Sequence, residues 1–314
     1  MFRAKIDLNP PLPAVTARSR HWMRSRFYRA ATIGSGVLLL AATAFASDFS
    51  GASAFKYTQA AVACGPLPSG SAANRQLQAY IRAQLRLLKC EVTEDPFIGK
   101  TPKGDVPMTN IIAKFPGKSG KAIAVSGHFD TKLFPSRKFV GANDGGSSTG
   151  LLLELARDLS GTPRVDDVYV VFFDGEEAVG EWTDTDSVYG SRHLAYKWKA
   201  DGTLARIKAL INVDMIGDKS LGLLLDENST PWLRKLVCNT AAELGYKAYF
   251  LDSPEKMDDD HMPFIKLGVP SLDLIDFDYD PWHKDSDTMD KLSAKSLDIV
   301  GTVVLESVHR LERQ

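Results

Sequence analysis

Residues 168–177 read VYVVFFDGEE, a run of apolar and aromatic residues that ends in three acids. The same pattern recurs along the chain: a short apolar run, typical of a buried strand, is followed by residues that bind metals or move protons. Residues 122–126 are followed by His128 and Asp130, and by Asp144 in the next loop, and residues 168–173 are followed by Asp174, Glu176 and Glu177. Residues 207–213 are followed by Asp214, and residues 271–275 by Trp282 and His283. In an open α/β sheet, ligands and catalytic groups gather at the carboxyl ends of the strands. A random scatter of acids and histidines would also fall on helix surfaces, so the placement predicts an enzyme site, and the residue types indicate zinc.

Helical patterns alternate with these strands and determine the fold class. Helices are expected over 72–88, 147–159, 187–199, 231–244 and 297–311, and further strands over 90–93, 109–115, 221–225 and 247–251. Alternating strands and helices predict a twisted, mostly parallel mixed sheet covered by helices on both faces. About 270 residues of this kind suit one large α/β domain better than two small ones.

The chain begins with a segment that we expect export to remove. A stretch rich in arginine precedes an apolar run over residues 30–46, which ends in Ala44-Phe45-Ala46. This order is typical of a secretory signal peptide with cleavage before Ser47. The alternative is an N-terminal membrane anchor, although the run is shorter than the roughly 20 apolar residues that a span needs. We therefore divide the chain into a signal peptide (1–46), an irregular lead-in segment (47–70) and a catalytic domain (71–314).

Charge and cysteine content restrict the partners of the mature protein. Residues 1–46 hold seven Lys/Arg and one Asp, which leaves 31 basic and 38 acidic residues and a net charge of −7. An acidic domain suits neither nucleic acid nor an anionic membrane, so we expect a periplasmic or secreted monomer with no stable membrane association. Export permits a disulfide between Cys64 and Cys90, which the sequence leaves open, and Cys238 is the third cysteine.

Three strand-end residues, Asp144, Glu177 and His283, suit a catalytic zinc site, which takes three protein ligands and keeps one position open. If Glu177 binds the metal, its neighbour Glu176 points elsewhere and can move protons beside it. Trp182 and Trp282 flank these residues in sequence, which favours a role as walls of a substrate pocket.

Other polar and aromatic residues receive structural interpretations. Asp258 and His261 precede Met262-Pro263 and fit the start of a helix, whereas Asp259 is retained as an acid of the catalytic network. We expect His193 and His309 to be structural or solvated, and Trp198 and Trp232 to lie in the core.

Six longer motifs carry a family resemblance. They are HFDTK (128–132), GAND (141–144), FFDGEEA (172–178), DSVYGSRHLA (186–195), DDHMPF (259–264) and WH (282–283). Over roughly residues 60–312 the chain resembles the animal-type glutaminyl-peptide cyclotransferases (glutaminyl cyclases), which share the fold of the zinc aminopeptidases of family M28.

The resemblance implies a role for each matched residue. Asp144, Glu177 and His283 would hold one zinc ion, and Glu176 would transfer protons with Asp214 and Asp259 as its hydrogen-bonded partners. Trp182 and Trp282 would line the glutamine pocket. Two features depart from the animal pattern: residues 145–148 (GGSS) look more like the aminopeptidases, and Asp273 stands where the animal enzymes carry a pocket histidine.

Three functions remain open from the sequence. The first is a cyclotransferase that converts the N-terminal glutamine of peptides to pyroglutamate and releases ammonia. The second is an aminopeptidase with two zinc ions, in which His128 and Asp214 complete a second metal site. The third is a non-catalytic binding domain, which would typically have lost ligands that are all present here.

Overall fold

The sheet of the protein contains eight strands in the order β1-β2-β4-β3-β5-β8-β6-β7. The computed structural model describes residues 49–314, so the signal peptide expected over residues 1–46 lies outside the described part. The strands are β1 (Glu91–Thr101), β2 (Gly104–Phe115), β3 (Ala122–His128), β4 (Asp167–Phe173), β5 (Ile207–Asp214), β6 (Leu223–Asp226), β7 (Phe250–Glu255) and β8 (Ser271–Ile275). Strands β4, β3, β5 and β8 run parallel, and β6 runs parallel to β7, whereas β1–β2, β2–β4 and β6–β8 are antiparallel. The mixed sheet confirms the predicted fold class.

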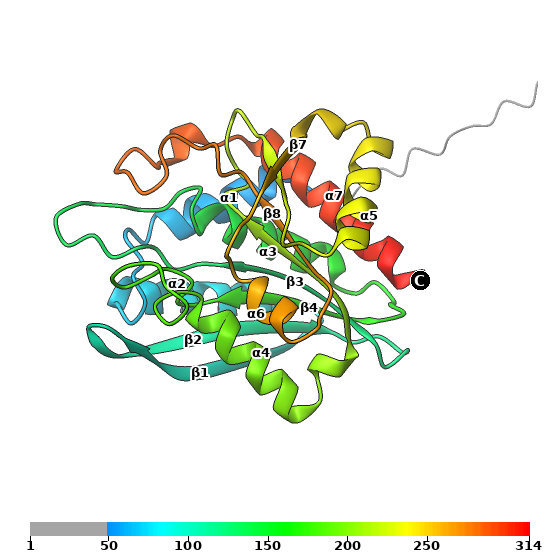
Figure 1. Ribbon diagram of the computed structural model, residues 1–314, viewed down its shortest axis with the longest axis horizontal. Coiled ribbons are helices and arrows are strands. Elements are labelled where there is room, and N and C mark those ends of the chain that lie inside the picture. Colours follow the sequence, from blue (N-terminus) through cyan, green and yellow to red (C-terminus); the bar gives the residue numbers. More distant parts are fainter. Residues whose placement is uncertain (1–48) are drawn as a thin grey trace, which may run out of the picture. The chain divides into compact units, whose positions relative to one another are not determined.

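Helices cover both faces of the sheet (Figure 1). They are α1 (Gly51–Val62), α2 (Ala72–Leu85), α3 (Gly146–Leu159), α4 (Tyr189–Asp201), α5 (Pro231–Glu243), α6 (Met262–Lys266) and α7 (Ala294–Glu312). One core packs α1, α2, α3, α5 and α7 against the sheet, and a second core packs α4 and α6 against the opposite face.

Strand β4 shows why the run VYVVFF is apolar throughout. Successive side chains of a strand point to opposite faces. Val168, Val170 and Phe172 therefore enter the first core, whereas Tyr169 and Phe173, with Val171, enter the second. A strand buried on both faces does not alternate apolar and polar residues as a half-exposed strand does. The acids of this segment therefore follow the last residue of the strand.

The expectation of an irregular segment over 47–70 is wrong, because helix α1 lies within it. The side chain of Ser50 caps this helix by accepting a hydrogen bond from Ser53 N. Small residues on the buried face bring α1 close to α3: a Cβ added at Gly150 would lie 2.0 Å from Thr58 Oγ1. The usual sequence signal of such a helix is a stripe of large apolar residues. This helix lacks that stripe and is stabilised by the close packing of small residues.

Several expected boundaries also change. The predicted strands 90–93 and 109–115 are parts of one long hairpin, β1–β2, and the strand predicted over 247–251 begins only at Phe250. Trp198 is buried as expected, but Trp232 is 44% exposed because it lies on the outer side of the first turn of α5. Cys64 and Cys90 form no disulfide, since their thiols donate to the carbonyl oxygens of Ala60 and Leu85.

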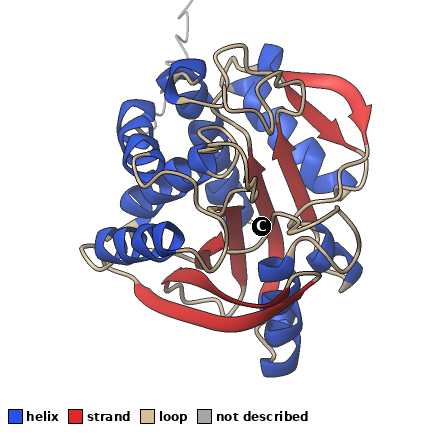
Figure 2. Ribbon diagram, turned by 90° about the vertical axis from the view of Figure 1, so that its left-hand side faces the viewer, coloured by secondary structure: helices blue, strands red, loops and turns tan. Residues whose placement is uncertain are grey.

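No helix within residues 49–314 is both long and apolar enough to span a bilayer. The loops that follow the parallel strands gather at one edge of the sheet, on the left of Figure 1 and facing the viewer in Figure 2.

Candidate active site

One cavity of about 760 Å³ opens at the carboxyl ends of the parallel strands. Eight residues selected from the sequence line it: Asp144, Glu176, Glu177, Trp182, Asp214, Asp259, Trp282 and His283. These residues come from loops and strand ends spread over 140 positions of the chain. The predicted convergence of the strand ends is therefore present in the structure.

Asp144, Glu177 and His283 form a compact group of metal-type ligands, with one ligand atom of each within 4.8 Å of the others. His283 Nε2 lies 3.2 Å from Glu177 Oε1 and 3.4 Å from Asp144 Oδ2. Among the described residues, no hydrogen-bond donor satisfies Asp144 Oδ2 or Glu177 Oε2, although both atoms are buried. Burial and the Glu177 carboxylate raise the pKa of Asp144 to about 7. Buried carboxylate oxygens that lack donors fit a site that binds a cation.

The loop of Asp144 is positioned by a second acid, Asp287. Its carboxylate accepts hydrogen bonds from the backbone N–H groups of Asn143 (2.9 Å) and Asp144 (3.2 Å) and from Tyr279 Oη (2.7 Å). His283 itself has a left-handed backbone (φ 54°), as does Met215 (φ 47°), which follows Asp214. Such conformations are uncommon for residues other than glycine, and they cluster at functional sites.

The Glu176–Glu177 loop is held by Asp130 and by the start of α4. The Asp130 carboxylate accepts from Glu176 N (3.0 Å) and Glu177 N (3.3 Å). On the other side, Val188 N donates to Glu176 O at 2.7 Å, and Val188 also has a left-handed backbone (φ 43°). The two adjacent glutamates are thereby fixed in a turn, with Glu177 directed to the metal-type group.

Asp174, which precedes this loop, has a structural environment. Its Oδ1 accepts from Ser69 Oγ (2.7 Å) and Asn74 Nδ2 (3.1 Å), and its Oδ2 accepts from Gln78 Nε2 (3.2 Å) and Thr109 N (2.9 Å). Four donors satisfy both oxygens and tie the end of β4 to α2 and β2.

His128, Asp144 and Asp214 form a second group of metal-type ligands behind the first. His128 Nε2 lies 3.0 Å from Asp214 Oδ1 and 3.4 Å from Asp144 Oδ1, and the ring is 1% exposed. Burial alone would lower the pKa of His128, but the carboxylates of Glu176 and Asp214 raise it well above its usual range. His128 does not line the cavity, whereas Asp144 and Asp214 do.

Glu176 is a buried acid in an acidic environment. Burial raises its pKa well above the usual range; His128 opposes this, and Glu177 and Asp259 add to it. Burial and Asp214 raise the pKa of Asp259 to about 6. Asp214 pairs with His128, and Asp259 accepts a hydrogen bond from Asp260 N. The expected hydrogen bonds of Glu176 with these two acids stay a prediction, and all three acids line one cavity.

The two tryptophans stand at the mouth of the cavity. Trp182 is 40% exposed and its Nε1 donates to Asp258 Oδ2 (3.4 Å). Trp282 is 38% exposed and stacks on His283, with ring centroids 4.2 Å apart, and it contacts Phe277 at a tilted angle with centroids 4.8 Å apart. Their exposure and their place in the cavity wall agree with the predicted role as pocket walls and not as core residues.

Other sequence-based interpretations have mixed outcomes. His261 occupies the N-cap position of α6, and its Nε2 lies 3.0 Å from the buried Asp226 carboxylate, so it is structural as expected. Asp258 was expected only to start a helix, but it lines the cavity and binds Trp182. His193 and His309 both lie outside the cavity, and both are only partly buried.

Several cavity residues that were not predicted come from loops without regular sequence patterns. Lys132 donates its backbone N–H to Glu177 Oε1 (3.0 Å), and its Nζ lies 3.7 Å from Glu177 Oε2. Phe134 contacts the edge of the His283 ring (5.7 Å between centroids), and Phe277 extends the wall beside Trp282. The HFDTK motif contains Lys132 and could have suggested it; no sequence signal identified the two phenylalanines.

Comparison with known proteins places this geometry in a family. Residues 110–308 match peptidase family M28. The chain belongs to peptidase family M28. The match includes all the residues selected above for the site, from His128 to His283.

Within this family, the similar proteins include cyclotransferases and an exopeptidase. The chain is 29% identical over 266 residues to a glutaminyl-peptide cyclotransferase of Drosophila melanogaster, covering 76% of this chain and 75% of that protein. It is 40% identical to a glutaminyl cyclase of an Acidobacteriales bacterium, whose crystal structure superimposes with a TM-score of 0.82 over 84% of this chain and 95% of that one. A Zn-dependent exopeptidase from Parabacteroides distasonis is 27% identical, with a TM-score of 0.74 over 82% and 97% of the two chains. The M28 fold is therefore common to relatives with different reactions, and the site must distinguish between them.

Proposed function

We propose that this M28 protein is a zinc-dependent glutaminyl-peptide cyclotransferase, which converts the N-terminal glutamine of peptides to pyroglutamate and releases ammonia. The composition of one cavity carries the proposal. Three metal-type ligands, a further buried glutamate and two tryptophans line the same 760 Å³ space. The similarity to several glutaminyl cyclases, at 40% identity in one case, supports it.

Zinc fits the ligands that are present. Asp144, Glu177 and His283 supply two carboxylates and one imidazole, a donor set that zinc accepts, and the buried oxygens without donors would be satisfied by a cation. When bound there, zinc would act as a Lewis acid toward the side-chain carbonyl of the glutamine.

The residues of the chain supply the remaining chemistry. The α-amine of the substrate attacks the carbon of the γ-carboxamide, a new C–N bond forms, and the original C–N bond breaks as ammonia leaves. Glu176 accepts a proton from the attacking amine and returns one to the departing nitrogen, which its raised pKa favours. Trp182 and Trp282 restrict the space and exclude water, so that ring closure is favoured over hydrolysis to glutamate.

A two-zinc aminopeptidase is the second candidate, and the group of His128, Asp144 and Asp214 favours it. An ion there would replace the hydrogen bond between His128 Nε2 and Asp214 Oδ1, which lie 3.0 Å apart. His128 does not line the cavity, which favours one ion in reach of substrate. Metal analysis of the dialysed protein separates the two: one zinc per chain supports the cyclotransferase, and two tightly held ions support the aminopeptidase.

The decisive experiment compares two substrates. Purified protein is incubated with Gln-X and Leu-X peptides, and the products are identified by mass spectrometry. Pyroglutamyl peptide and ammonia from Gln-X, with Leu-X unchanged, are expected. Release of free leucine without any pyroglutamate would contradict the proposal and support the aminopeptidase.

We further propose that the protein is exported and cleaved before Ser47, and that it acts on peptide N-termini as a monomer in the periplasm or outside the cell. The motif Ala44-Phe45-Ala46 after an apolar run supports cleavage. Mass spectrometry of the protein from its native host should show a start at Ser47. A chain that retains residues 30–46 and sediments with membranes would support the anchor instead.

A further inference from the structure

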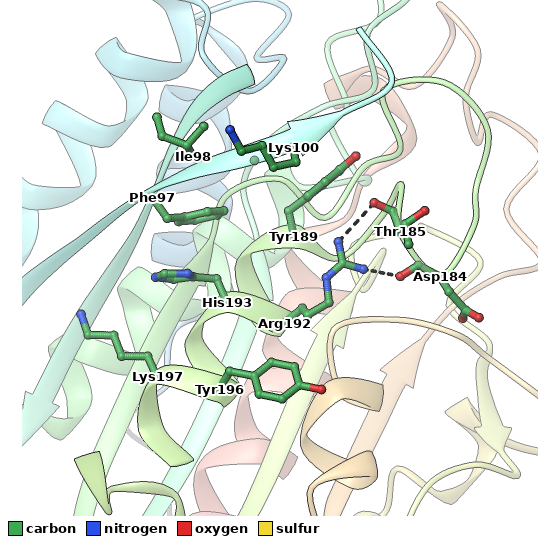
Figure 3. A pocket seen from close by; sticks show the side chains of 11 residues that line it. Phe97, Ile98, Lys100, Asp184, Thr185, Tyr189, Arg192, His193, Tyr196 and Lys197 are labelled. Carbon is green, nitrogen blue, oxygen red and sulfur yellow. Dashed lines mark hydrogen bonds between the residues drawn. The ribbon is translucent and has the colours of Figure 1, made fainter. Parts of the chain in front are cut away.

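A second concave surface lies beside the active-site cavity, between strand β1 and helix α4 (Figure 3). We call it the β1–α4 groove; it has a volume of about 700 Å³, within the range of ligand-binding pockets. Phe97 and Lys100 come from β1, and Arg192, His193 and Tyr196 come from α4. None of these residues belongs to the metal-type groups.

The groove presents apolar side chains that nothing in residues 49–314 covers. Tyr196 is 60% exposed, and Ile98, which is 54% exposed, stands on the opposite face of β1 from Phe97 (Figure 3). Phe97 stacks on His193 with ring centroids 4.4 Å apart and almost parallel planes, which fixes a flat aromatic wall. Exposed apolar side chains gathered in a concave surface are typical of interaction sites.

The cations of the groove differ in how strongly they are already bound. Arg192 is committed to the fold, because its guanidinium donates to the backbone carbonyls of Asp184 and Thr185. Lys197 contacts the buried Asp95 at 2.6 Å. Lys100, by contrast, pairs with Asp105 while both side chains are largely exposed, a contact that a ligand carboxylate could replace at little cost.

Strand β1 also offers backbone groups to an extended ligand. It is the edge strand of the sheet, paired only with β2. An edge strand has a row of N–H and C=O groups without a strand partner, and peptides commonly bind such edges in an extended conformation.

A small hollow of about 60 Å³ lies between the groove and the active-site cavity. It shares Asp258 with the cavity and Arg192 and Tyr196 with the groove. The connecting loop carries Trp182, and Arg192 fixes the same loop at Asp184 and Thr185. A peptide that leaves the cavity past Trp182 therefore meets this hollow and then the groove.

We propose that the β1–α4 groove is a secondary substrate-binding site. It binds the part of a peptide substrate that lies several residues after the N-terminal glutamine, in an extended conformation. It selects substrates in which this part carries an aromatic or aliphatic side chain close to acidic side chains. The aromatic wall and Tyr196 take the apolar side chain, Lys100 takes a carboxylate, and the edge of β1 bonds the peptide backbone. The proposal rests on the proposed function, since it assigns the site to the substrate of that reaction.

The test compares substrates that share their first residues. Gln-X dipeptide amide is compared with three longer peptides that begin with the same Gln-X and then carry Phe with Glu residues, Phe with Lys residues, or only Gly and Ser. For the wild type we expect kcat/KM for the Phe/Glu peptide to exceed that for the Gly/Ser peptide by roughly three- to tenfold, mainly through KM. The Phe/Lys peptide should lose most of this advantage.

Two double variants provide the control. Lys100→Glu with Tyr196→Ala changes one exposed lysine and one exposed aromatic side chain of the groove. Lys121→Glu with Trp232→Ala changes one exposed lysine and one exposed aromatic side chain outside the groove, at the amino end of β3 and on α5. The first double variant should abolish the preference for the Phe/Glu peptide over the Gly/Ser peptide, and the second should keep it.

The outcomes separate the two proposals. A wild type that cyclises the dipeptide but treats all three longer peptides alike would overturn the groove and leave the proposed function intact. A wild type that cyclises no glutaminyl peptide would overturn both. Equal loss of preference in both double variants would also contradict the groove, and if the groove variant fails to fold, the wild-type peptide series still decides.

Discussion

Two buried acidic centres lie within one loop of each other and are built in opposite ways. Asp174 at the end of β4 receives four hydrogen-bond donors, two on each carboxylate oxygen. Glu177, three residues later, faces Asp144 and His283, and each of the two carboxylates has an oxygen without a donor. Burying a carboxylate is costly unless its charge is compensated. In the first centre, donors of the chain oppose the rise in the pKa of Asp174, which burial and Asp130 bring to about 7, whereas in the second an oxygen of each carboxylate is left for a cation.

The largest expected effect concerns the acid beside the second centre. Glu176→Gln removes a proton acceptor without changing the shape of the side chain, and we expect turnover of Gln-X to fall by roughly 10²–10⁴-fold. Zinc content should stay unchanged, because Glu176 is not one of the three ligands. Steady-state kinetics with metal analysis on the same sample checks both expectations. A variant with most of its activity would show that the roles of the two adjacent glutamates are wrongly assigned.

The tryptophans extend the comparison from acids to aromatic side chains. Trp198→Ala empties part of the second core and should cost about 3–5 kcal/mol of stability. Trp282→Ala should lower the melting temperature only slightly, since the ring is 38% exposed, but should reduce kcat/KM for Gln-X strongly. Thermal unfolding and kinetics of both variants test this. A large loss of stability in Trp282→Ala would identify that residue as structural.

Matched amide substitutions test the comparison between the two centres directly. Glu177→Gln replaces an anionic ligand by a neutral one. Loss of a residue that only hydrogen-bonds to a metal ligand typically lowers metal affinity about 10- to 100-fold, and the loss of zinc affinity in Glu177→Gln should be larger. Asp174→Asn replaces one acceptor oxygen by an NH2 donor that faces two of the four donors, which should cost about 1–3 kcal/mol of stability while zinc stays bound. Competition with a chelator and denaturant unfolding measure the two quantities. If the variants exchange these effects, the comparison fails.

The smallest expected effect is a dependence of zinc affinity on pH. The pKa of Asp144 is raised to about 7 by burial and Glu177, and that of His283 is raised by its hydrogen bond to Glu177 although burial opposes this. Below pH 7 zinc must displace protons, so its affinity should rise with pH by about tenfold per unit for each proton displaced, and level off above pH 7. Chelator competition at pH 6, 7 and 8 measures the slope. Asp174→Asn should keep this slope, and an affinity independent of pH would contradict the raised pKa values.

The parts of the molecule that the sequence predicted are those set by strand ends. Runs such as VYVVFF are recognisable because a strand buried on both faces excludes charge, so Glu176, Glu177 and Asp214 stand out where the runs stop. Helix α1 was missed because close packing of small residues, as at Gly150, leaves no periodic signal. Phe134 and Phe277 were missed because their positions depend on loops whose paths are set by contacts distant in sequence, such as that of Asp287 with the Asp144 loop. Trp232 shows the reverse error, since residue type alone does not say which side of a helix faces the core.

The left-handed backbone at Val188 has a consequence for laboratory evolution of this protein. A β-branched residue is a rare occupant of this conformation, which costs about 1–3 kcal/mol, and here it joins the start of α4 to the loop of Glu176. Val188→Gly would relieve this strain, because glycine adopts the conformation freely, but it would also remove a buried side chain, which offsets the gain. The same substitution would loosen the turn that fixes the two glutamates. Thermostable lineages that retain activity should therefore keep Val188 and acquire their stabilising changes elsewhere.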